Sequence, residues 1–470
     1  MKLFQVINLA RDYLILGVIG LIFMWFIYWI FLRKFLKNHV KSHIKKVVIF
    51  CILFCYIVIV SGATIFIRPG VYEHANLHLF SSYIEAWNNY SKSYWRNIVL
   101  NILMFVPFGF LLPLFSDKFK NFFATMSLSL MFTVGIEVTQ YITKRGIFEV
   151  DDIMNNWIGA LIGYSLVMFI LLIFSKEKTR FKPLKLTLCI LPIVLTLAIT
   201  YKIIENYNNQ EFGNLSSDYN YVYHMDDVTL SSDVELNSKD IKKQKVYISE
   251  RYTKEETLQF AESFFKELNA KLDKSNIETY ANQVVYNSKD KRYRLAVHLR
   301  GGTYDLDDFK SDKNKIYSNM DEESVKDILS SYNIEVYPNS QFEEQKDLDE
   351  NDKSYIYKFS VDLEDKDNKL TDGYISVDQN DENLHINNYI YQYDVCGEYK
   401  IISEEEAYEK IKAGEFNSYE LYDIQSIVVR SVKLCYQVDS KGFYQPVYRF
   451  ECTIDGEGRP IFIPALAQNY

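Results

Sequence analysis

The chain has few of the residues that build metal centres and reactive nucleophiles. Its 470 residues include only 6 cysteines and 7 histidines. There is no CxxC pair and no cluster of cysteine with histidine, which argues against a zinc site. After residue 203 the histidines are isolated, and no Ser/His/Asp or Cys/His arrangement of a hydrolase is evident. We therefore expect neither a metal nor a cofactor.

The cysteines also limit the role of disulfides. Cys396, Cys435 and Cys452 lie in the polar second half of the chain. An odd number argues against a full disulfide framework and leaves a single bridge open. The acidic run at 347–354 is most simply a solvated loop, with weak calcium binding as the alternative.

Hydropathy and charge divide the chain into two parts. Residues 1–203 consist largely of apolar runs and carry 21 Lys and Arg against 9 Asp and Glu, a net charge of +12. Residues 204–470 carry a net charge of −21 and are rich in tyrosine. The first part is typical of an integral membrane domain and the second of a water-exposed globular domain. The acidic second part does not favour nucleic acid as a partner.

Six apolar stretches are long enough to cross a bilayer, since about 20 residues span its hydrocarbon core. The first has no small-residue cleavage site and is closely followed by a second span, so we interpret it as an anchor and not a signal peptide. The predicted spans are roughly 13–32, 47–67, 98–115, 122–142, 153–174 and 184–203.

Lysine and arginine in the connections predict the orientation. The connections 33–46, 116–121 and 175–183 carry 12 basic residues, and the alternate connections 68–97 and 143–152 carry 5. The basic connections are expected in the cytoplasm. Six spans then place both termini and residues 204–470 outside the cytoplasm.

Polar residues at membrane depth gather at one predicted face. Carboxylates and amides there are uncommon and need partners. The third span begins, the fourth ends and the fifth begins on the outer side, and the polar groups lie at these three places. The predicted ligand-binding residues are Asn101, Glu137, Gln140, Arg145, Asp152 and Asn156.

The fifth span carries a stripe of small and polar residues. Asp152, Asn156, Gly159 and Gly163 are spaced 4, 3 and 4 residues apart, so they share one helix face. Glycines in this pattern let a neighbouring helix approach closely. The polar end of the stripe is therefore expected to face the bundle interior.

Structural explanations remain open for single residues. Asp151 or Asp152 is placed to cap its own helix, and Asn101 with Asn97 to sit at a helix start. Glu137 can pair with Arg145 across a loop. Pro107 and Gly109 are tolerated in membrane helices and can mark a kink.

Four segments resemble the VanZ-like membrane protein family. They are "NILMFVPFG" (101–109), "EVTQ" (137–140), Arg145 and "DDIMNNWIGALIGY" (151–164). The resemblance covers residues 45–175. It implies a polytopic protein of the bacterial plasma membrane, in a family whose founding member is linked to teicoplanin resistance. The family pattern falls on Asn101, Phe105, Pro107, Gly109, Glu137, Gln140, Arg145, Asp152, Asn156 and Gly159, and Glu149 follows Arg145 one residue later than the pattern has it.

The second half predicts an α+β domain, 204–470, in which a helix and antiparallel strands recur. Helices are expected at 253–272, 321–332 and 403–416, with capping boxes at Thr253/Glu256 and Ser403/Glu406. The sequence "DGEGRP" predicts a hairpin turn near the end. The rhythm indicates sub-units 204–315, 316–400 and 401–470.

The last sixty residues resemble PepSY-type domains and membrane-anchored cell-wall regulators of the YycI/YycH kind. The resemblance is carried by "SEEEAYEKIKAGEF" and the strands that follow it. It implies that this domain binds or regulates an envelope protein partner.

Two functions follow from these patterns. In the first, which we favour, the polar residues bind a lipid-linked cell-wall component such as a peptidoglycan precursor, or a lipoglycopeptide, at the outer membrane face. In the second, Glu137 and Asp152 are the acid and base of an intramembrane hydrolase or transferase that acts on such a lipid.

Overall fold

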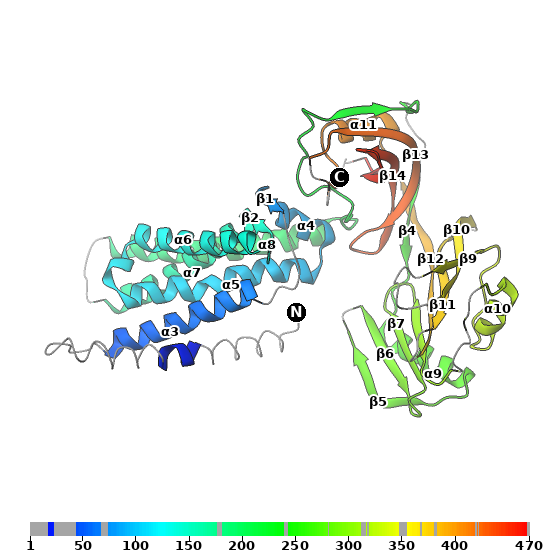
Figure 1. Cartoon of the computed structure of the whole chain (residues 1–470), viewed down its shortest axis with the longest axis horizontal. Coiled ribbons are helices and arrows are strands. Elements are labelled where there is room, and N and C mark those ends of the chain that lie inside the picture. The colour runs from blue at the N-terminus through cyan, green and yellow to red at the C-terminus, as the bar shows by residue number, and fades with distance from the viewer. Residues whose placement is uncertain are drawn as a thin grey trace. The chain divides into compact units, whose positions relative to one another are not determined.

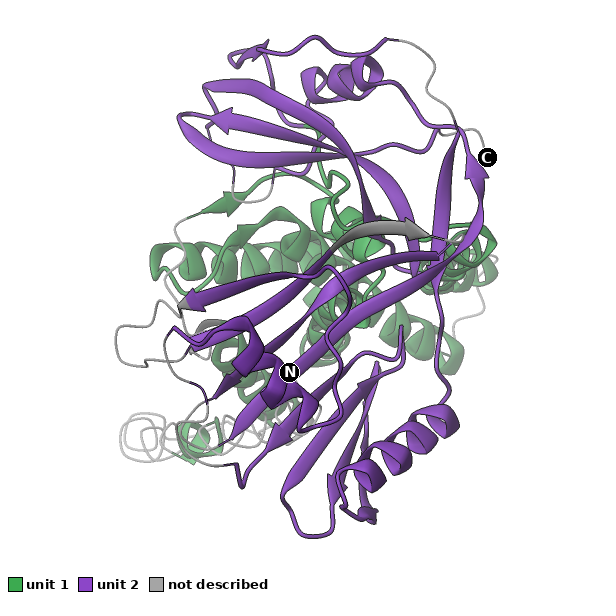
Figure 2. Ribbon diagram, turned by 90° about the vertical axis from the view of Figure 1, so that its right-hand side faces the viewer, with its two compact units in different colours: residues 1–222 green, residues 223–470 purple. Residues whose placement is uncertain are grey.

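The chain folds into two compact units. The structure, a computed structural model, describes residues 17–22, 44–66, 74–175, 181–238, 243–280, 282–311, 316, 319–346, 355–366, 369–379, 383–418, 421 and 423–467. The units comprise residues 1–222 and 223–470, coloured green and purple in Figure 2. Each has hydrophobic clusters of its own.

The first unit is helical. Its helices are α3 (Ile44–Ser61), α4 (Ser81–Asn89), α5 (Lys92–Phe115), α6 (Phe122–Ile142), α7 (Val150–Phe174) and α8 (Lys182–Asn209), shown in Figure 1. A 3₁₀ turn, η3 (Asp117–Lys120), joins α5 to α6, and Ser91 and Asn121 cap α5 and α6. A short parallel pair, β1 (Ala75–Asn76) with β2 (Phe148–Glu149), lies near α4 (Figure 1).

Five helical stretches are long and apolar enough to cross a membrane. They are Lys46–Thr64, Lys92–Phe115, Phe122–Ile142, Val150–Phe174 and Lys182–Asn209. The predicted first span, 13–32, falls mainly outside the described residues, which include a helical segment at 17–22. Six spans, and the orientation that depends on them, therefore remain predictions.

The structure differs from the predicted spans at several helix bounds and in one connection. Helix α5 begins at Lys92 and not at 98, and α7 begins at Val150 and not at 153. The last helix continues to Asn209, beyond the predicted end at 203. The connection 68–97, predicted as a long loop between two spans, holds α4 and β1. The sequence of α4 is amphipathic and only weakly apolar, so a search for membrane spans does not detect it.

The second unit is built on one large sheet. Its strands are β3 (Thr229–Ser232), β4 (Gln244–Ser249), β5 (Leu272–Thr279), β6 (Gln283–Ser288), β7 (Tyr293–His298), β8 (Tyr304–Asp308), β9 (Gln341–Lys346), β10 (Tyr355–Lys366), β11 (Lys369–Gln379), β12 (Leu384–Tyr399), β13 (Ser426–Val438), β14 (Phe443–Ile454) and β15 (Glu457–Pro464). The main order is β3-β13-β14-β4-β12-β8-β7-β6-β5. Strand β15 joins β14, and β11, β10 and β9 branch from β12.

Three helices accompany this sheet, and each lies within a predicted range. They are α9 (Lys254–Glu267), α10 (Glu322–Ser330) and α11 (Glu404–Lys412). Both predicted capping boxes are present, at Thr253/Glu256 and Ser403/Glu406. The turn between β14 and β15 uses Asp455 and Gly456, both with positive φ, as a tight hairpin requires. These local predictions are confirmed.

The sheet joins the predicted sub-units. Strand β12 pairs with β8 and β11 through its first half and with β4 through its second half. One buried cluster lies against α9 and α10 and another against α11. The second half of the chain is thus sheet-rich, as predicted, while its division into helix-and-hairpin repeats is not established. Its three cysteines, Cys396, Cys435 and Cys452, are free.

Candidate functional site

The predicted ligand-binding residues lie on three helices of the first unit, α5, α6 and α7, except Arg145, which lies in the turn that follows α6. Helix α5 begins, α6 ends and α7 begins at the same end of the bundle, where β1, β2 and α4 also lie (Figure 1). We call this region the polar end. It brings together side chains that are up to 55 positions apart in the sequence, from Asn101 to Asn156.

Asn101 and Asp152 join the two helices that pack most closely. The Asn101 Nδ2 atom donates a hydrogen bond to the Asp152 carboxylate. Both residues are half-buried. Helices α5 and α7 share the largest helix–helix interface among the described residues, so this pair closes that interface at its polar end.

Glu137 is buried and holds the start of α7. Only 2% of the residue is exposed, and its carboxylate accepts the backbone N–H of Glu149 at 3.1 Å. Glu149 is the N-cap residue of α7, where a negative charge is stabilised by the helix dipole. Asp152 lies three residues further along the same helix, so the structure places both carboxylates at the polar end.

Gln140 and Asn156 are buried amides, and in each the nitrogen donates a hydrogen bond while the oxygen accepts none among the described residues. Gln140 Nε2 donates to the carbonyl of Thr64 at 2.8 Å, and Asn156 Nδ2 donates to Thr133 Oγ1 at 2.9 Å. Gln140 Oε1 and Asn156 Oδ1 are buried without a hydrogen-bond partner among the described residues, as is Asn155 Nδ2. Most buried polar groups in proteins are paired, so three such atoms at one end of a bundle require an explanation.

Arg145 lies on the surface at the polar end. The residue is exposed, and its backbone N–H donates to the Gln140 carbonyl at 3.0 Å, which closes the end of α6. A cation that follows the last turn of a helix is favoured by the helix dipole. Its exposure leaves the guanidinium in reach of a ligand in water.

A second set of contacts was not predicted from the sequence. The Asp151 carboxylate accepts the backbone N–H groups of Phe80 at 2.6 Å and Ser82 at 2.9 Å, and the Ser82 hydroxyl. Phe80 supplies no side-chain cap to α4. Asp151 therefore caps α4. It is not the N-cap of its own helix, which is Glu149, but Asp151 and Asp152 are both acidic residues of the first turn of α7, the alternative that their positions also allowed.

Asn155 lies one turn after Asp151 and also faces α4. The Tyr83 hydroxyl donates to Asn155 Oδ1. Burial raises the pKa of Tyr83 to about 12, with a further contribution from the carboxylates of Asp151 and Asp152. The spacing of 151 and 155 by four residues is a sequence signal for a shared face. It was missed because α4, their partner, was not expected.

The remaining predicted residues are structural. A Cβ atom added to Gly109 meets Ala160 O at 1.9 Å, and one added to Gly163 meets Val106 O at 2.0 Å. Gly159 similarly lies against α5. Phe105 is fully buried against Phe108 and Phe132, while Pro107 is exposed within α5. The described residues include no group of three His, Cys, Asp or Glu side chains placed to hold a metal ion.

Part of the first unit, which includes the polar end, matches a family model. Residues 46–174 match the VanZ/LLP1 family model. The VanZ-like resemblance of this region is thereby confirmed, and it indicates a multi-pass membrane protein with a role in the cell envelope or in antibiotic resistance. Among curated proteins, none matches the chain.

Part of this chain is similar to a solved structure. It is the Bacillus megaterium YpeB C-terminal domain, at 13% sequence identity and a TM-score of 0.21, over 46% of this chain and 95% of that one. A TM-score this low does not establish a shared fold. The PepSY-like character of the region that follows the VanZ-like helices therefore stays a prediction.

Proposed function

We propose that the VanZ-like region binds a lipid-linked cell-envelope component or a lipoglycopeptide at the extracytoplasmic face of the membrane. The observation that carries this proposal is the trio of buried atoms Gln140 Oε1, Asn155 Nδ2 and Asn156 Oδ1, which have no partner among the described residues. An unsatisfied buried polar atom costs roughly 1–3 kcal/mol. A ligand that offers hydroxyl and carbonyl groups recovers part of this free energy.

The residues around these atoms suit an amphiphile with an anionic, sugar- or peptide-bearing head. In the half-buried pair Asn101–Asp152, Asp152 lies one helical turn nearer the start of α7 than Asn156 does. Arg145 is exposed and lies seven residues before Asp152 in the chain. Arginine binds phosphate and carboxylate groups in a bidentate manner. In this proposal Arg145 binds the charged group and the amides bind the sugar or peptide, while the lipid chain stays in the bilayer.

Residues 223–470 have a separate role in this proposal. They form their own compact, acidic unit with no hydrolase arrangement evident in the sequence. We assign to them the binding of an envelope protein or the control of access to the polar end.

Catalysis by Glu137 and Asp152 is the second candidate. Their unequal burial, 2% exposure for Glu137 against half-burial for Asp152, is the difference in environment that separates an acid from a base. Each carboxylate, however, already accepts a hydrogen bond that joins two elements, from Glu149 N–H and from Asn101. Binding therefore accounts for more of the arrangement than catalysis does.

The test uses the purified full-length protein in lipid nanodiscs. A fluorescent lipid-linked peptidoglycan precursor, and separately teicoplanin, is titrated against the wild type, Gln140→Leu and Asn156→Leu. Loss of one hydrogen bond predicts about a tenfold weaker affinity. The matched control is Thr139→Val, because Thr139 lies next to Gln140 on the same helix, is half-buried, and its hydroxyl donates to the Gly135 carbonyl one turn earlier.

The same preparation separates the two candidates. Saturable binding without product, weakened in Gln140→Leu and unchanged in Thr139→Val, supports the binding function. Turnover of the labelled precursor that disappears in Glu137→Gln and Asp152→Asn would show an enzyme instead. Absence of saturable binding by both ligands refutes the proposal. Teicoplanin susceptibility of cells that express the wild type or Gln140→Leu then tests the role in resistance.

A further inference from the structure

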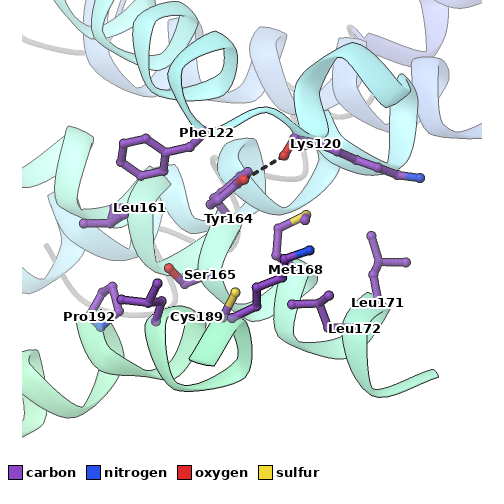
Figure 3. Close-up of a pocket in the computed structure, with 12 residues that line it drawn as sticks. Lys120, Phe122, Leu161, Tyr164, Ser165, Met168, Leu171, Leu172, Cys189 and Pro192 are labelled. Atoms are coloured by element: carbon purple, nitrogen blue, oxygen red, sulfur yellow. Dashed lines mark hydrogen bonds between the residues drawn. The ribbon is translucent and has the colours of Figure 1, made fainter. Parts of the chain in front are cut away.

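The first unit contains a cavity away from its polar end. The cavity has a volume of about 800 Å³ and lies between the second half of α7 and the first half of α8, next to η3 (Figure 3). Its volume is in the range of small-molecule sites, about 300–1,000 Å³. The lining residues from α7 are Leu161, Tyr164, Ser165, Met168, Leu171 and Leu172.

The walls of the cavity are mostly apolar and belong to membrane-spanning segments. Met168 and Leu172 of α7 face Leu188 and Pro192 of α8 across it. None of the most apolar part of α8 is buried within the chain. The cavity is therefore bounded by a helix that is open to lipid on its other faces, so an acyl chain can enter from the bilayer.

Basic residues surround one end of the cavity. Lys120 and Lys185 line it, and Lys182 donates to the Ser175 carbonyl at 2.9 Å at the adjacent end of α7. Lys46 and Lys118 add further positive charge at this end of the bundle. The contact with Lys120 lowers the pKa of Asp117, and Lys46 is close enough to make a smaller contribution. The orientation predicted from the sequence places this end at the cytoplasmic leaflet.

The contact of Lys120 at this end is weak enough to exchange. Lys120 pairs with Asp117 at 2.6 Å, but both side chains are largely exposed, 47% and 84%. Such surface pairs contribute about 0–1 kcal/mol. The α8 helix also begins here, and its N-cap residue, Phe181, makes no side-chain cap hydrogen bond. Free N–H groups at a helix start favour an anion.

We propose that this cavity holds one acyl chain of an anionic phospholipid from the cytoplasmic leaflet, with the lipid phosphate at Lys120, Lys185 and the start of α8. This lipid is distinct from the ligand of the polar end and takes no part in its binding. Tyr164 holds the site together, because its hydroxyl donates to the Lys120 carbonyl at 2.8 Å and so fixes η3 against α7 (Figure 3).

Photolabelling of the full-length protein in vesicles tests this site. Phosphatidylglycerol and phosphatidylcholine analogues, each with a diazirine in one acyl chain, are activated and the labelled peptides are identified. The phosphatidylglycerol analogue should label residues 161–172 and 188–192 in preference to the phosphatidylcholine analogue. One lysine near a membrane surface contributes about 1 kcal/mol toward an anionic lipid, which is about fivefold.

Two variants and matched controls complete the experiment. The double variant Lys120→Gln/Lys185→Gln should reduce the preference for phosphatidylglycerol by about ten- to thirtyfold. The variant Ser165→Phe should reduce labelling by both analogues, because the larger side chain fills the cavity. The charge control is Lys92→Gln/Lys202→Gln, which removes two lysines from the parts of α5 and α8 that lie farthest from η3. Lys202, like Lys120, forms an exposed ion pair, in this case with Glu205. The bulk control is Leu197→Phe, at a position of α8 that is 66% exposed.

Three results would overturn the proposal. Equal labelling by the two analogues would show that the site does not select an anionic headgroup. If the preference for phosphatidylglycerol is unchanged in Lys120→Gln/Lys185→Gln, these lysines do not bind the headgroup. This test does not depend on whether the Ser165→Phe protein folds. Absence of lipid adducts at Met168 and Leu188, together with disulfide cross-links between chains that carry cysteine at these two positions, shows that a second copy of the chain covers the cavity. None of these results changes the binding at the polar end, so the two proposals fail separately.

Discussion

Replacing Gly159 with alanine tests the closest approach of two helices in the VanZ-like region. A Cβ atom at residue 159 lies 1.9 Å from Ile102 O, whereas ordinary contacts begin at 3.4 Å. The helices α5 and α7 must therefore separate locally by about 1.5 Å. The two nearest atoms, Ile102 O and Ile102 C, belong to the backbone and cannot rotate away. Overpacking of this kind costs about 1–3 kcal/mol, and more where the backbone has to move.

Gly135→Ala is the matched control for this experiment. Gly135 lies on α6, and a Cβ atom there meets nothing within 4 Å. The substitution should therefore be neutral or stabilise the helix by up to about 1 kcal/mol, the difference in helix propensity. The expected gap between the two variants is thus about 1–4 kcal/mol in the free energy of unfolding.

The assay is unfolding of the full-length protein in mixed micelles with increasing SDS, followed by tryptophan fluorescence. Trp157 on α7 is a suitable probe, since its indole N–H donates to the Met126 carbonyl at 3.2 Å. A Gly159→Ala protein as stable as Gly135→Ala would show that α5 and α7 do not approach this closely. Adding Gly163→Ala to Gly159→Ala should cost less than Gly163→Ala alone, because the helices have already separated.

Two further predictions concern charged groups. Asp151→Asn should destabilise the first unit by about 1–2 kcal/mol in the same SDS assay, because the charge that caps α4 is lost, and Ser82→Ala should cost less because the two backbone donors remain. In the second unit, the hydrogen bond from His385 to Asp307 (2.8 Å) raises the pKa of His385, although burial opposes this. Its stabilisation should be complete below about pH 6.5 and be lost as the pH rises through the folded-state pKa. Urea unfolding of the full chain between pH 5 and 9 checks this, and a His385→Gln protein with the same pH dependence would contradict it.

The sequence predicts the features that depend on local pattern. Among the described residues, apolar runs locate five helices that are long and apolar enough to cross a membrane. The two capping boxes locate the starts of α9 and α11. The residues Asp455 and Gly456 predict the last hairpin because few residues adopt positive φ at both central positions of a turn. In each of these cases the interacting groups lie within a few residues of one another.

The features that were missed depend on residues far apart in the chain. Helix α4 is weakly apolar, and its N-terminal acceptor is Asp151, 71 residues beyond Phe80. The partner of Gln140 is a backbone carbonyl at Thr64, which no side-chain pattern marks. The division of β12 between β8 and β4 likewise depends on strand pairings more than 75 residues apart. Spacing indicates which side chains share a face, but it does not identify what that face meets.

The capping of α4 by Asp151 has a consequence for the order in which the chain assembles. Residues 81–89 leave the ribosome well before Asp151 does, so the start of α4 has to remain without its carboxylate acceptor while two apolar spans, α5 and α6, enter the membrane. Only the arrival of α7 supplies that acceptor, and the same helix brings Asn155 to Tyr83. Formation of α4 therefore reports that the following three spans have been inserted and have met, and a truncated chain that ends before residue 151 should leave this segment unfolded at the membrane surface.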